Sequence, residues 1–425
     1  MSDKLLVGLV RAYGSPLYVY DLGALDAAAA ALRAALPAPS TLYYSLKANP
    51  HPQIARALRL AGCHAEISSE GELTAALEAG FDGSQCLYTG PGKTTRETNA
   101  ALRAGVRRFS VESATDYRRV AACAQAHDVS VTCLLRLNAD SPEGASGLRM
   151  TGTPSQFGLD SAALLAAPEE FAPLPGARIA GTHFFAMSNA RNPEDLLASL
   201  TASITEAARV HRATGIAPEV VDLGGGFAAP YAAAGERLDY AALREPLEEA
   251  LDAHLPGWRS GAPVIAFESG RYLAGGCGQL VCTVSDVKQS RDRGYVVLDT
   301  GIHHLGGLAG LGRLLPMQAA ALTLRPEEQR SGHDDGDVAP PQRVSLVGPL
   351  CTPADVLSRT SDLGPSSEGD LLGVANVGAY GLTASLLGFL SRPAAAEIVL
   401  RADDVVEASR LVLHRTPLTP SPQDT

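Results

Sequence analysis

Between residues 41 and 271, short apolar runs that favour strands alternate with alanine-rich stretches that favour helices. The expected strands are 41–47, 64–69, 86–91, 108–113, 131–138, 178–187, 220–227 and 264–271. Helical stretches separate them, among them 53–60, 71–79 and 196–213. Parallel strands need crossovers of this kind, and eight such repeats are typical of a (β/α)8 barrel. We therefore expect an α/β fold built on a TIM-type barrel.

Polar or glycine residues follow the apolar part of each expected strand. They are Lys47, Glu66, Thr89 to Lys93, Glu112, Arg136 to Asn138, His183 to Asn189, Asp222 to Gly226 and Glu268 to Arg271. Barrel enzymes build their active sites at the C-terminal ends of the strands. The pattern therefore predicts one active site at that end of the barrel.

The pattern changes after Arg271, where strand-like runs continue without helices of the barrel type between them. These runs are 279–288, 294–300, 344–350, 370–377 and 397–413. We expect two domains, a barrel at 23–272 and an all-β domain at 273–415, with the segment 1–22 joining the β domain. The loop at 325–342 is rich in proline, glycine and charge, and we expect it and the tail at 416–425 to be flexible.

Composition excludes several classes of protein. The formal net charge is −11 and no basic run occurs, which argues against a nucleic-acid partner. No apolar stretch approaches the roughly 20 residues of a membrane span, and the N-terminus does not resemble a signal peptide. Seven cysteines without C-x-x-C pairs favour free thiols in a reducing compartment. We expect a cytoplasmic protein with no membrane contact and no metal site.

Lys47 is one of only four lysines among 35 basic residues, the others being Lys4, Lys93 and Lys288. It closes an apolar strand, where an ammonium is costly unless it is paired or deprotonated. A lysine that loses its proton readily can form an imine with an aldehyde. The alternative is a lysine that extends from a strand end into water.

Glycines and charged residues follow the seventh and eighth expected strands, where barrels commonly bind phosphate. Gly224, Gly225 and Gly226 could close on an anion through backbone N–H groups, or could form a simple turn. Glu268 and Arg271 could be an ion pair. They could also act separately, with Arg271 on a phosphate and Glu268 on a protonated ring nitrogen, as pyridoxal 5'-phosphate (PLP) requires.

Together these motifs resemble the fold type III PLP-dependent decarboxylases, the ornithine/diaminopimelate decarboxylase family. The matching segments run nearly the length of the chain: YYSLKANP at 43–50, EISSEGEL at 66–73, GPGK at 90–93, SQFG at 155–158, DLGGGF at 222–227, ESGR at 268–271, GPLCTPAD at 348–355 and GAYGLTAS at 378–385. The resemblance implies a PLP-binding barrel of the alanine racemase type, a C-terminal β domain and a homodimer with active sites shared across its interface.

The resemblance also implies roles for single residues. Lys47 would form the imine with PLP, Glu268 would contact the ring nitrogen, and Cys351 from the partner chain would protonate the α-carbon after CO2 leaves. Residues expected around the cofactor are Glu66, Arg136, His183, Phe185, Ser188, Gly224, Gly225, Gly226, Gly270, Arg271 and Tyr380. From the residues alone, Cys351 could equally be a small buried side chain, and Tyr380 a core tyrosine.

The chain departs from the family pattern H-x-H-x-G-S near His183. Phe185 takes the place of the histidine that stacks on the cofactor, and Met187 takes the place of the glycine. A phenyl ring can stack on a pyridine face but cannot share a proton. Glu66 replaces a common aspartate and Ser269 replaces a common proline, and both changes look tolerable.

The largest departure is Thr352. Family members that act on basic amino acids carry an acid after the catalytic cysteine, which pairs with the distal ammonium of the substrate. Threonine cannot pair with an ammonium, and leaving one unpaired and buried costs several kcal/mol. A second expected acid near residues 311–316 is absent as well.

We therefore predict an α-decarboxylase of an amino acid without a free distal ammonium, resembling the branch that acts on carrier-protein-bound or siderophore-type substrates in secondary metabolism. Arg313 could meet a distal carboxylate or a phosphopantetheine, or simply lie on the surface. Asp355 could contact the substrate or cap a following helix. Three alternatives stay open: a decarboxylase of free diaminopimelate or ornithine, a PLP racemase or epimerase, and a relative without catalysis that binds partner proteins.

Overall fold

The computed structural model describes residues 1–138, 148–149, 156–306, 318–324 and 342–417. Arg313, residues 325–341 of the expected flexible loop and the tail from 418 lie outside the described residues. The chain divides into two compact units. The barrel unit holds Asp21–Gly278 and Asn376–Tyr380, and the β unit holds Met1–Tyr20, Gln279–Ala375 and Gly381–Thr425.

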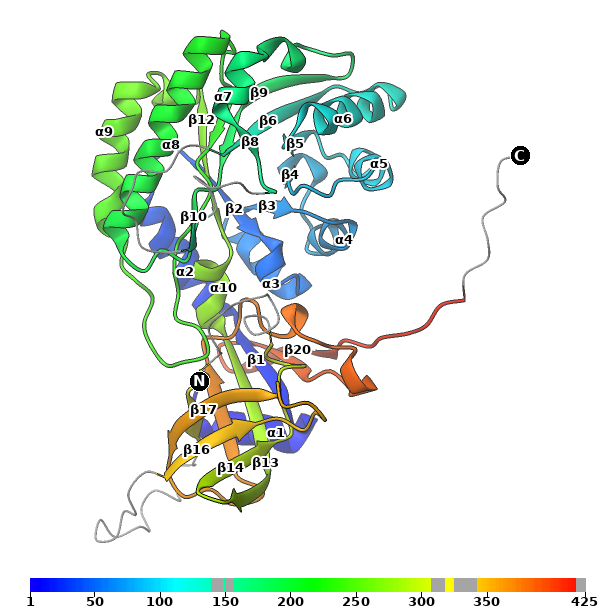
Figure 1. The fold of residues 1–425 in the computed structure, drawn as a ribbon, viewed down its shortest axis with the longest axis vertical. Coiled ribbons are helices and arrows are strands. Elements are labelled where there is room, and N and C mark those ends of the chain that lie inside the picture. The colour runs from blue at the N-terminus through cyan, green and yellow to red at the C-terminus, as the bar shows by residue number, and fades with distance from the viewer. Residues whose placement is uncertain (139–147, 150–155, 307–317, 325–341, 418–425) are drawn as a thin grey trace. The chain divides into compact units, whose positions relative to one another are not determined.

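Eight parallel strands close into a barrel in the barrel unit, as the sequence predicts (Figure 1). In order around the barrel they are β2 (Thr41–Ser45), β3 (His64–Ile67), β4 (Cys86–Tyr88), β5 (Arg108–Val111), β6 (Val131–Asn138), β9 (Ala177–Phe184), β11 (Val220–Asp222) and β12 (Val264–Ser269). Pairing of β12 with β2 completes the ring. Two short pairs lie outside it: β8 (Leu159–Asp160) extends β6, and β7 (Leu148–Arg149) pairs with β10 (Met187–Ser188).

Helices follow the strands and cover the outside of the barrel (Figure 1). They are α2 (Leu22–Ala35), α3 (Pro52–Leu60), α4 (Glu70–Glu78), α5 (Thr95–Arg103), α6 (Ala114–Ala126), α7 (Ser161–Ala166), α8 (Pro193–Thr214), α9 (Arg244–His254) and α10 (Arg271–Ala274). Local sequence sets their ends. Ser69 caps the start of α4 by accepting from the N–H of Glu72, and Gly215 ends α8 in the left-handed conformation.

The barrel is filled by side chains rather than open along its axis. Tyr43, Leu87, Leu134 and Val220 come from the alternate strands β2, β4, β6 and β11 and pack in one buried cluster. Layers built from alternate strands are the usual way in which such a barrel is filled. The interior is thus closed by apolar side chains, and polar chemistry is confined to the ends of the strands.

The β unit is built on a mixed sheet with strand order β17-β16-β14-β13-β1-β19-β20. Its strands are β1 (Leu17–Asp21), β13 (Gly278–Ser290), β14 (Arg293–Leu298), β15 (Ala321–Thr323), β16 (Gln342–Val347), β17 (Val356–Leu363), β18 (Leu371–Ala375), β19 (Ala396–Arg401) and β20 (Asp404–Arg410). Leu17 and Val19 of β1 are buried in a core with Val281 and Ile398. The N-terminal strand therefore joins the β sheet, as expected.

Three features of the β unit differ from the sequence prediction. Helix α1 (Asp3–Tyr13) was not predicted, although Leu6 and Leu9 lie on its buried face. Strands β15 and β17 were missed. The run 397–413 forms the hairpin β19–β20 rather than one strand, because Ala402 and Asp403 take up positive φ and turn the chain.

The segment Asn376–Tyr380, expected in the β domain, belongs to the barrel unit. Backbone hydrogen bonding explains the difference, since the N–H of Tyr380 donates to the carbonyl of Ala48 at 2.7 Å. The side chain of Asn49 also donates to the carbonyl of Gly378 at 2.9 Å. Tyr380 is thereby tied to the turn that carries Lys47. Among the described helices, none has the length and apolar character that crossing a membrane requires.

Candidate active site

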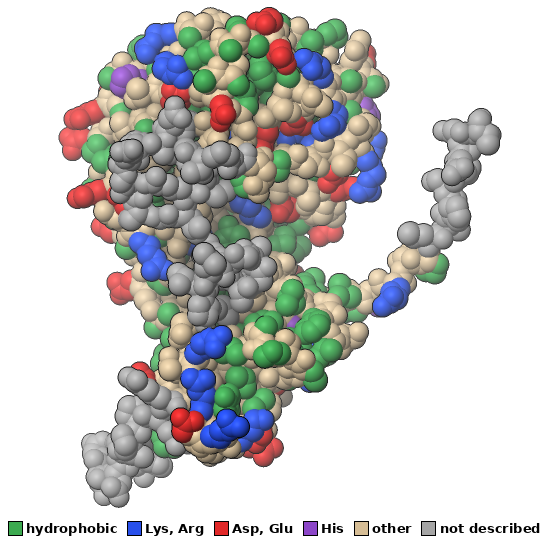
Figure 2. Space-filling view, viewed as in Figure 1, with side chains coloured by type: hydrophobic (Ala, Val, Ile, Leu, Met, Phe, Trp, Pro, Cys, Tyr) green, Lys and Arg blue, Asp and Glu red, His purple; other side chains and the backbone are tan. Residues whose placement is uncertain are grey.

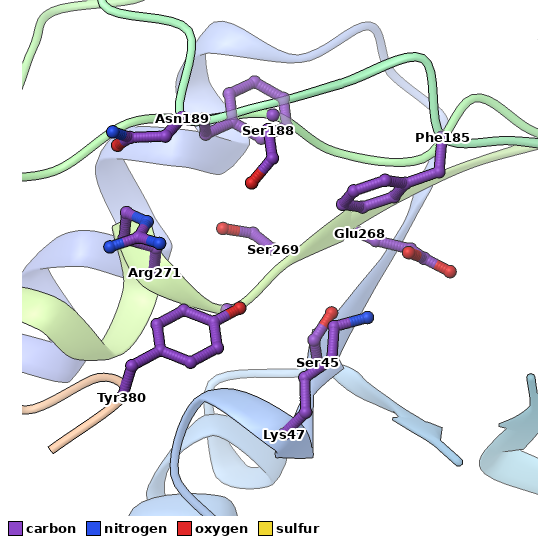
Figure 3. A pocket seen from close by; sticks show the side chains of 12 residues that line it. Ser45, Lys47, Phe185, Ser188, Asn189, Glu268, Ser269, Arg271 and Tyr380 are labelled. Atoms are coloured by element: carbon purple, nitrogen blue, oxygen red, sulfur yellow. The ribbon is translucent and has the colours of Figure 1, made fainter. Parts of the chain in front are cut away.

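A pocket lies at the C-terminal ends of the barrel strands (Figure 3). All of its walls come from the barrel unit: Ser45, Lys47, Phe185, Ser188, Asn189, Gly226, Phe227, Glu268, Ser269, Gly270, Arg271 and Tyr380. Figure 3 shows that Arg271, Tyr380 and Asn189 gather at one end, while Lys47, Glu268 and Phe185 lie at the other. The pocket therefore has a cationic end and an end that carries an amine and a carboxylate.

Lys47 lies in a turn that follows strand β2, whereas the sequence predicts it as the last residue of the strand. Strand β2 stops at Ser45, and Lys47 lies in the short 3-10 turn Leu46–Ala48. Its amine is 3.1 Å from Oε2 of the buried Glu66. Burial lowers the pKa of Lys47, but the carboxylates of Glu66 and then Glu268 outweigh it, so the net pKa is raised. The contact with Glu66 favours the charged form of this amine in the ligand-free protein, whereas the sequence suggests a lysine that loses its proton readily.

The surroundings of Glu66 favour its ionised form. Burial raises its pKa, but the charge of Lys47 and hydrogen bonds from Thr89 and Ser45 outweigh that effect and lower it. The hydroxyl of Thr89 donates to Oε1 of Glu66. Glu66 does not line the pocket itself and instead orients the lysine that does.

Two cations lie near the ring of Phe185. The amine of Lys47 is 5.3 Å from the centre of its ring, and Cζ of Arg136 is 5.9 Å from it. Arg136 is held from behind by Glu112, whose Oε1 accepts from the guanidinium at 2.9 Å. Cations near a ring face are attracted by its negative face. Arg136 therefore supports Phe185 from outside the pocket, and only Phe185 contributes to the wall.

The three glycines after β11 have two different tasks. A Cβ on Gly224 would lie 2.0 Å from the carbonyl oxygen of Phe184, and a Cβ on Gly225 would lie 2.4 Å from that of Glu268. Both glycines therefore allow the backbones of β9, β11 and β12 to pack together. Gly226, with φ of +115°, is the one of the three that lines the pocket.

The cationic end of the pocket is made by Arg271 and its neighbours. Cζ of Arg271 lies 4.7 Å from the centre of the Tyr380 ring. The backbone carbonyl of Tyr380 accepts from the hydroxyl of Tyr231 at 2.8 Å, which fixes this tyrosine in its left-handed conformation. Gly270 is packed so closely that a Cβ there would lie 2.7 Å from Cβ of Ala48. This end offers one guanidinium, hydroxyl groups and close backbone, which is a suitable set for an anion.

Three buried polar atoms of pocket residues have no hydrogen-bond partner among the described residues. They are Oγ of Ser269, Oδ1 of Asn189 and Oε1 of Glu268. Buried polar atoms in proteins are rarely left unsatisfied without a reason, such as an absent ligand.

Four wall residues were not among the predicted site residues: Ser45, Asn189, Phe227 and Ser269. Each lies within two residues of a predicted one, so their position at or just beyond the strand ends was the available signal.

Glu268 reaches the pocket from β12, and two buried residues lie behind it. His183 contacts Glu268 at 3.2 Å, and Asp222 lies in the same cluster. His183 was predicted to contact the cofactor, but it does not line the pocket. Asp222 was not predicted as a site residue, although it opens the DLGGGF motif.

The predicted residues of the β unit lie in the loop between β16 and β17. Cys351 is exposed, whereas the other six cysteines are buried. The hydroxyl of Thr352 accepts from the N–H of Ala354 at 3.3 Å. Asp355 is buried and does not precede a helix, since strand β17 follows it. The suggestion that it caps a helix is therefore wrong.

The two oxygens of Asp355 bind backbone instead. Oδ1 accepts from the N–H of Ile302 at 2.8 Å, and Oδ2 accepts from the N–H of Leu350 at 2.7 Å. The same carboxylate fills the space that side chains on Gly301 and Gly348 would need. Asp355 therefore fixes the shape of the loop that carries Cys351 and Thr352.

Comparison with known proteins identifies the family. Residues 22–275 match the pyridoxal-binding domain of the pyridoxal-dependent decarboxylases. The chain belongs to this family. It is accordingly a PLP-dependent decarboxylase with the fold type III architecture, which the closed barrel and the all-β unit described above confirm.

Individual relatives cover nearly the whole chain. An L-glutamyl-[BtrI acyl-carrier protein] decarboxylase of Niallia circulans is 29% identical over 93% of this chain and 91% of its own length. A diaminopimelate decarboxylase of Methanothermobacter thermautotrophicus is 29% identical over 95% of this chain and 93% of its own. The solved structure of a Helicobacter pylori diaminopimelate decarboxylase with L-lysine has the same fold. It gives a TM-score of 0.80 at 22% identity and covers 95% of this chain and 96% of that one.

The pocket residues fit the cofactor of this family. PLP carries a phosphate, an aldehyde and a basic ring nitrogen, and the pocket presents Arg271 at one end and Lys47 with Glu268 at the other. The unpartnered hydroxyl of Ser269 provides a buried donor that a phosphate oxygen would satisfy. The ring of Phe185 offers an apolar face beside Lys47 and Glu268.

Proposed function

We propose that the protein decarboxylates an α-amino acid whose side chain has no free distal ammonium. A glutamyl group held on a carrier protein, or a similarly conjugated amino acid of secondary metabolism, fits this description. The similarity to the Niallia circulans enzyme supports this substrate class. The similarity to a diaminopimelate decarboxylase is of the same size, so the choice between them depends on this chain's own residues.

The observation that carries the proposal is the chemistry of the loop at 348–355. Its one carboxylate, Asp355, is buried and has both oxygens bound by backbone N–H groups. The neighbouring Thr352 is neutral and uses its hydroxyl in a local turn. The described loop thus has no carboxylate to offer an ammonium. An unpaired ammonium in a closed site costs several kcal/mol, which is at least two decades in affinity.

Each side chain of the pocket would have its own role in the reaction. Bound PLP supplies an electron sink for the electron pair that stays on the α-carbon when CO2 leaves. Lys47 would hold the cofactor at its aldehyde end, with Glu66 keeping the lysine in place. Arg271 and Ser188 would hold the phosphate with the backbone of Gly226 and Gly270.

Three further side chains complete the reaction. Glu268 would pair with the ring nitrogen, and Phe185 would lie against the ring and exclude water. Cys351 returns one proton to the α-carbon, so the substrate loses CO2 and gains a proton. Cys351 is suited to this task because it is the exposed thiol among seven fully described cysteines, whereas burial raises the pKa of others such as Cys63 and Cys86.

We also propose that the active enzyme is a homodimer in which Cys351 serves the pocket of the partner. Apolar side chains are exposed on the hairpin strand β20 and on the segments around it, over the β unit in Figure 2. They are Leu386, Phe389, Leu390, Val405, Val406, Leu411, Val412 and Leu413. A surface of this kind favours contact with another protein surface, and a second copy is the commonest partner.

Release of CO2 by purified, PLP-loaded protein tests the substrate class. The panel holds ornithine, lysine, diaminopimelate, free glutamate and the glutamyl thioester of a carrier protein, with the Lys47→Ala variant as the inactive control. We expect turnover of the thioester and none of the free diamino acids. Turnover of diaminopimelate or ornithine would instead support the second candidate, a decarboxylase of free amino acids.

A further inference from the structure

Three ionisable side chains meet in the barrel interior directly behind the pocket. His183, Asp222 and Glu268 lie at the ends of the neighbouring strands β9, β11 and β12. All three are at most 2% exposed. One ring nitrogen of His183 and one oxygen from each carboxylate lie within 4.8 Å of one another. Only Glu268 also lines the pocket, so the other two can act on a bound molecule only through it.

The surroundings of His183 determine which of its nitrogens carries a hydrogen. Nδ1 lies 2.7 Å from the hydroxyl of Ser110, which can either donate or accept. Nε2 lies 3.2 Å from Oε1 of Glu268. An ionised carboxylate can only accept, so a hydrogen between these two atoms belongs to the ring. The contact between Nε2 and Oε1 is close but lacks the alignment of a hydrogen bond, so His183 acts on Glu268 through proximity and charge.

Asp222 is the second neighbour of Glu268. Its Oδ1 accepts from the N–H of Gly224 at 2.9 Å, while Oδ2 is buried without a hydrogen-bond partner among the described residues. Two close carboxylates in a buried site do not both ionise easily. Burial, and then the charge of Glu268, raise the pKa of Asp222 to about 7, although His183 and the N–H of Gly224 oppose them. The surroundings of Asp222 therefore favour a proton on this carboxyl group.

Other charged groups also face the cluster, and Glu66 among them favours a proton on Asp222. Lys47 lies on the pocket side, where Glu268 contributes to raising its pKa. Tyr43 of β2 accepts from Arg108 of β5 at 2.9 Å. Burial raises the pKa of Tyr43, and Asp222 and Glu268 add to this despite the opposing charge of Arg108, so the phenol stays neutral. Glu66 adds a small effect that raises the pKa of Asp222.

We propose that His183 and Asp222 are positioning residues that hold the carboxylate of Glu268 in place and direct its second oxygen to the cofactor's ring nitrogen. The inference rests on the proposed role of Glu268 in the pocket. It assigns to His183 a place behind the carboxylate rather than on the cofactor. It also gives Asp222, which opens the DLGGGF motif, a task beyond holding the turn at Gly224.

Binding of PLP to the ligand-free protein tests the inference through a double-mutant cycle. His183→Gln should weaken PLP binding about tenfold, since the close contact that holds Glu268 in place is lost. Glu268→Gln should weaken it at least as much, and the double variant no further, because His183 acts only through Glu268. Losses that multiply in the double variant would overturn the proposal. His211→Gln, which alters a buried histidine of α8 bonded to Thr182, is the matched control and should leave the affinity unchanged.

An analogue of PLP with carbon in place of the ring nitrogen separates positioning from general damage. The wild type, His183→Gln and Glu268→Gln should all bind this 1-deaza analogue with the same affinity, because it has no nitrogen for the carboxylate to meet. If His183→Gln weakens the analogue as much as PLP, its role is structural and the proposal fails. If the wild type binds neither molecule, the proposed function fails instead.

The proton on Asp222 can be tested without any cofactor. Because its folded-state pKa is raised to about 7 from 3.8, its contribution to stability is full below about pH 4 and is lost as pH rises through 7. The stability of ligand-free wild type should therefore fall between pH 5 and 8 relative to Asp222→Asn, and parallel curves would contradict the assignment. If Asp222→Asn does not fold, 15N spectra of the His183 ring in the wild type decide: a hydrogen on Nε2 supports the cluster, and a bare Nε2 or a stoichiometric bound metal ion overturns it.

Discussion

The amine of Lys47 lies 3.1 Å from Oε2 of Glu66, and this contact raises the pKa of the lysine and lowers that of the carboxyl group. The contact therefore favours the ammonium form of the lysine that the sequence singles out. Reaction with an aldehyde requires that it lose this proton, and Glu66 determines how readily that occurs.

Replacing Glu66 by glutamine should shift cofactor attachment to lower pH. Without the carboxylate, the desolvated Lys47 loses the main factor that raises its pKa, so the free amine becomes available at lower pH. The rate at which the cofactor band at about 410–430 nm grows after PLP is added should reach its midpoint at least about one pH unit lower. Glu70→Gln is the control, because it alters an exposed ion pair between Glu70 of α4 and Arg96 of α5. It should leave the pH midpoint of cofactor attachment unchanged. An unshifted midpoint in Glu66→Gln would show that Glu66 does not hold the lysine.

Substitution of Cys351 by alanine should slow product formation by about two decades while PLP stays bound. The thiol is proposed as the general acid, and such groups contribute roughly 10²-fold or more. Steady-state product formation and the cofactor spectrum report the two effects separately. Cys123→Ala, in the buried face of α6, is the matched control and should keep wild-type turnover. Wild-type turnover in Cys351→Ala would leave this cysteine without a catalytic role.

Mixing two inactive variants should restore activity if the site is shared. In an equal mixture of Lys47→Ala and Cys351→Ala chains, about half of the dimers are mixed and one of their two sites is intact. Activity should therefore recover to about a quarter of the wild-type value once subunits have exchanged. Exchange is verified by mass spectrometry of the mixed dimer. Complete exchange without recovery would exclude a pocket that takes Cys351 from the partner.

Gly225 should tolerate no side chain, for a reason that sequence does not reveal. A Cβ there would lie 2.4 Å from the carbonyl oxygen of Glu268, so Gly225→Ala must push β11 away from β12. We expect the free energy of unfolding to fall by about 1–3 kcal/mol, the usual cost of overpacking. Gly92→Ala, where no atom lies within 4 Å of the new Cβ, is the control and should change stability little. Equal stability of the two variants in urea would contradict this explanation.

The barrel could be predicted from sequence because periodicity determines it. All eight expected strands exist, and the polar residues that follow them line or support one pocket. The pattern reports which residues are buried, and burial follows from the period of the strand. Helix α1 and strand β15 escaped detection because each is short and takes its stability from long-range packing, which leaves little trace in the local sequence.

The roles of neighbouring residues were harder to predict than their location. Gly224 and Gly226 are two positions apart in one glycine run, yet one packs against Phe184 and the other lines the pocket. Glu66 and His183 lie near strand ends, as Lys47 does, but neither lines the cavity. Glu66 contacts Lys47, and His183 contacts Glu268. Such distinctions depend on distances of a few ångströms between different strands. No spacing within one strand contains that information.

The substrate class is the central claim, and a single competition measures it most directly. PLP-loaded enzyme is given equal concentrations of the glutamyl carrier-protein thioester and ornithine, each with a distinct isotope in the α-carboxyl group. Because the loop at Thr352 offers no carboxylate to an ammonium, the thioester should yield at least about a hundred times more CO2 than ornithine. More CO2 from ornithine than from the thioester would contradict the account, and would make this protein a decarboxylase of free diamino acids.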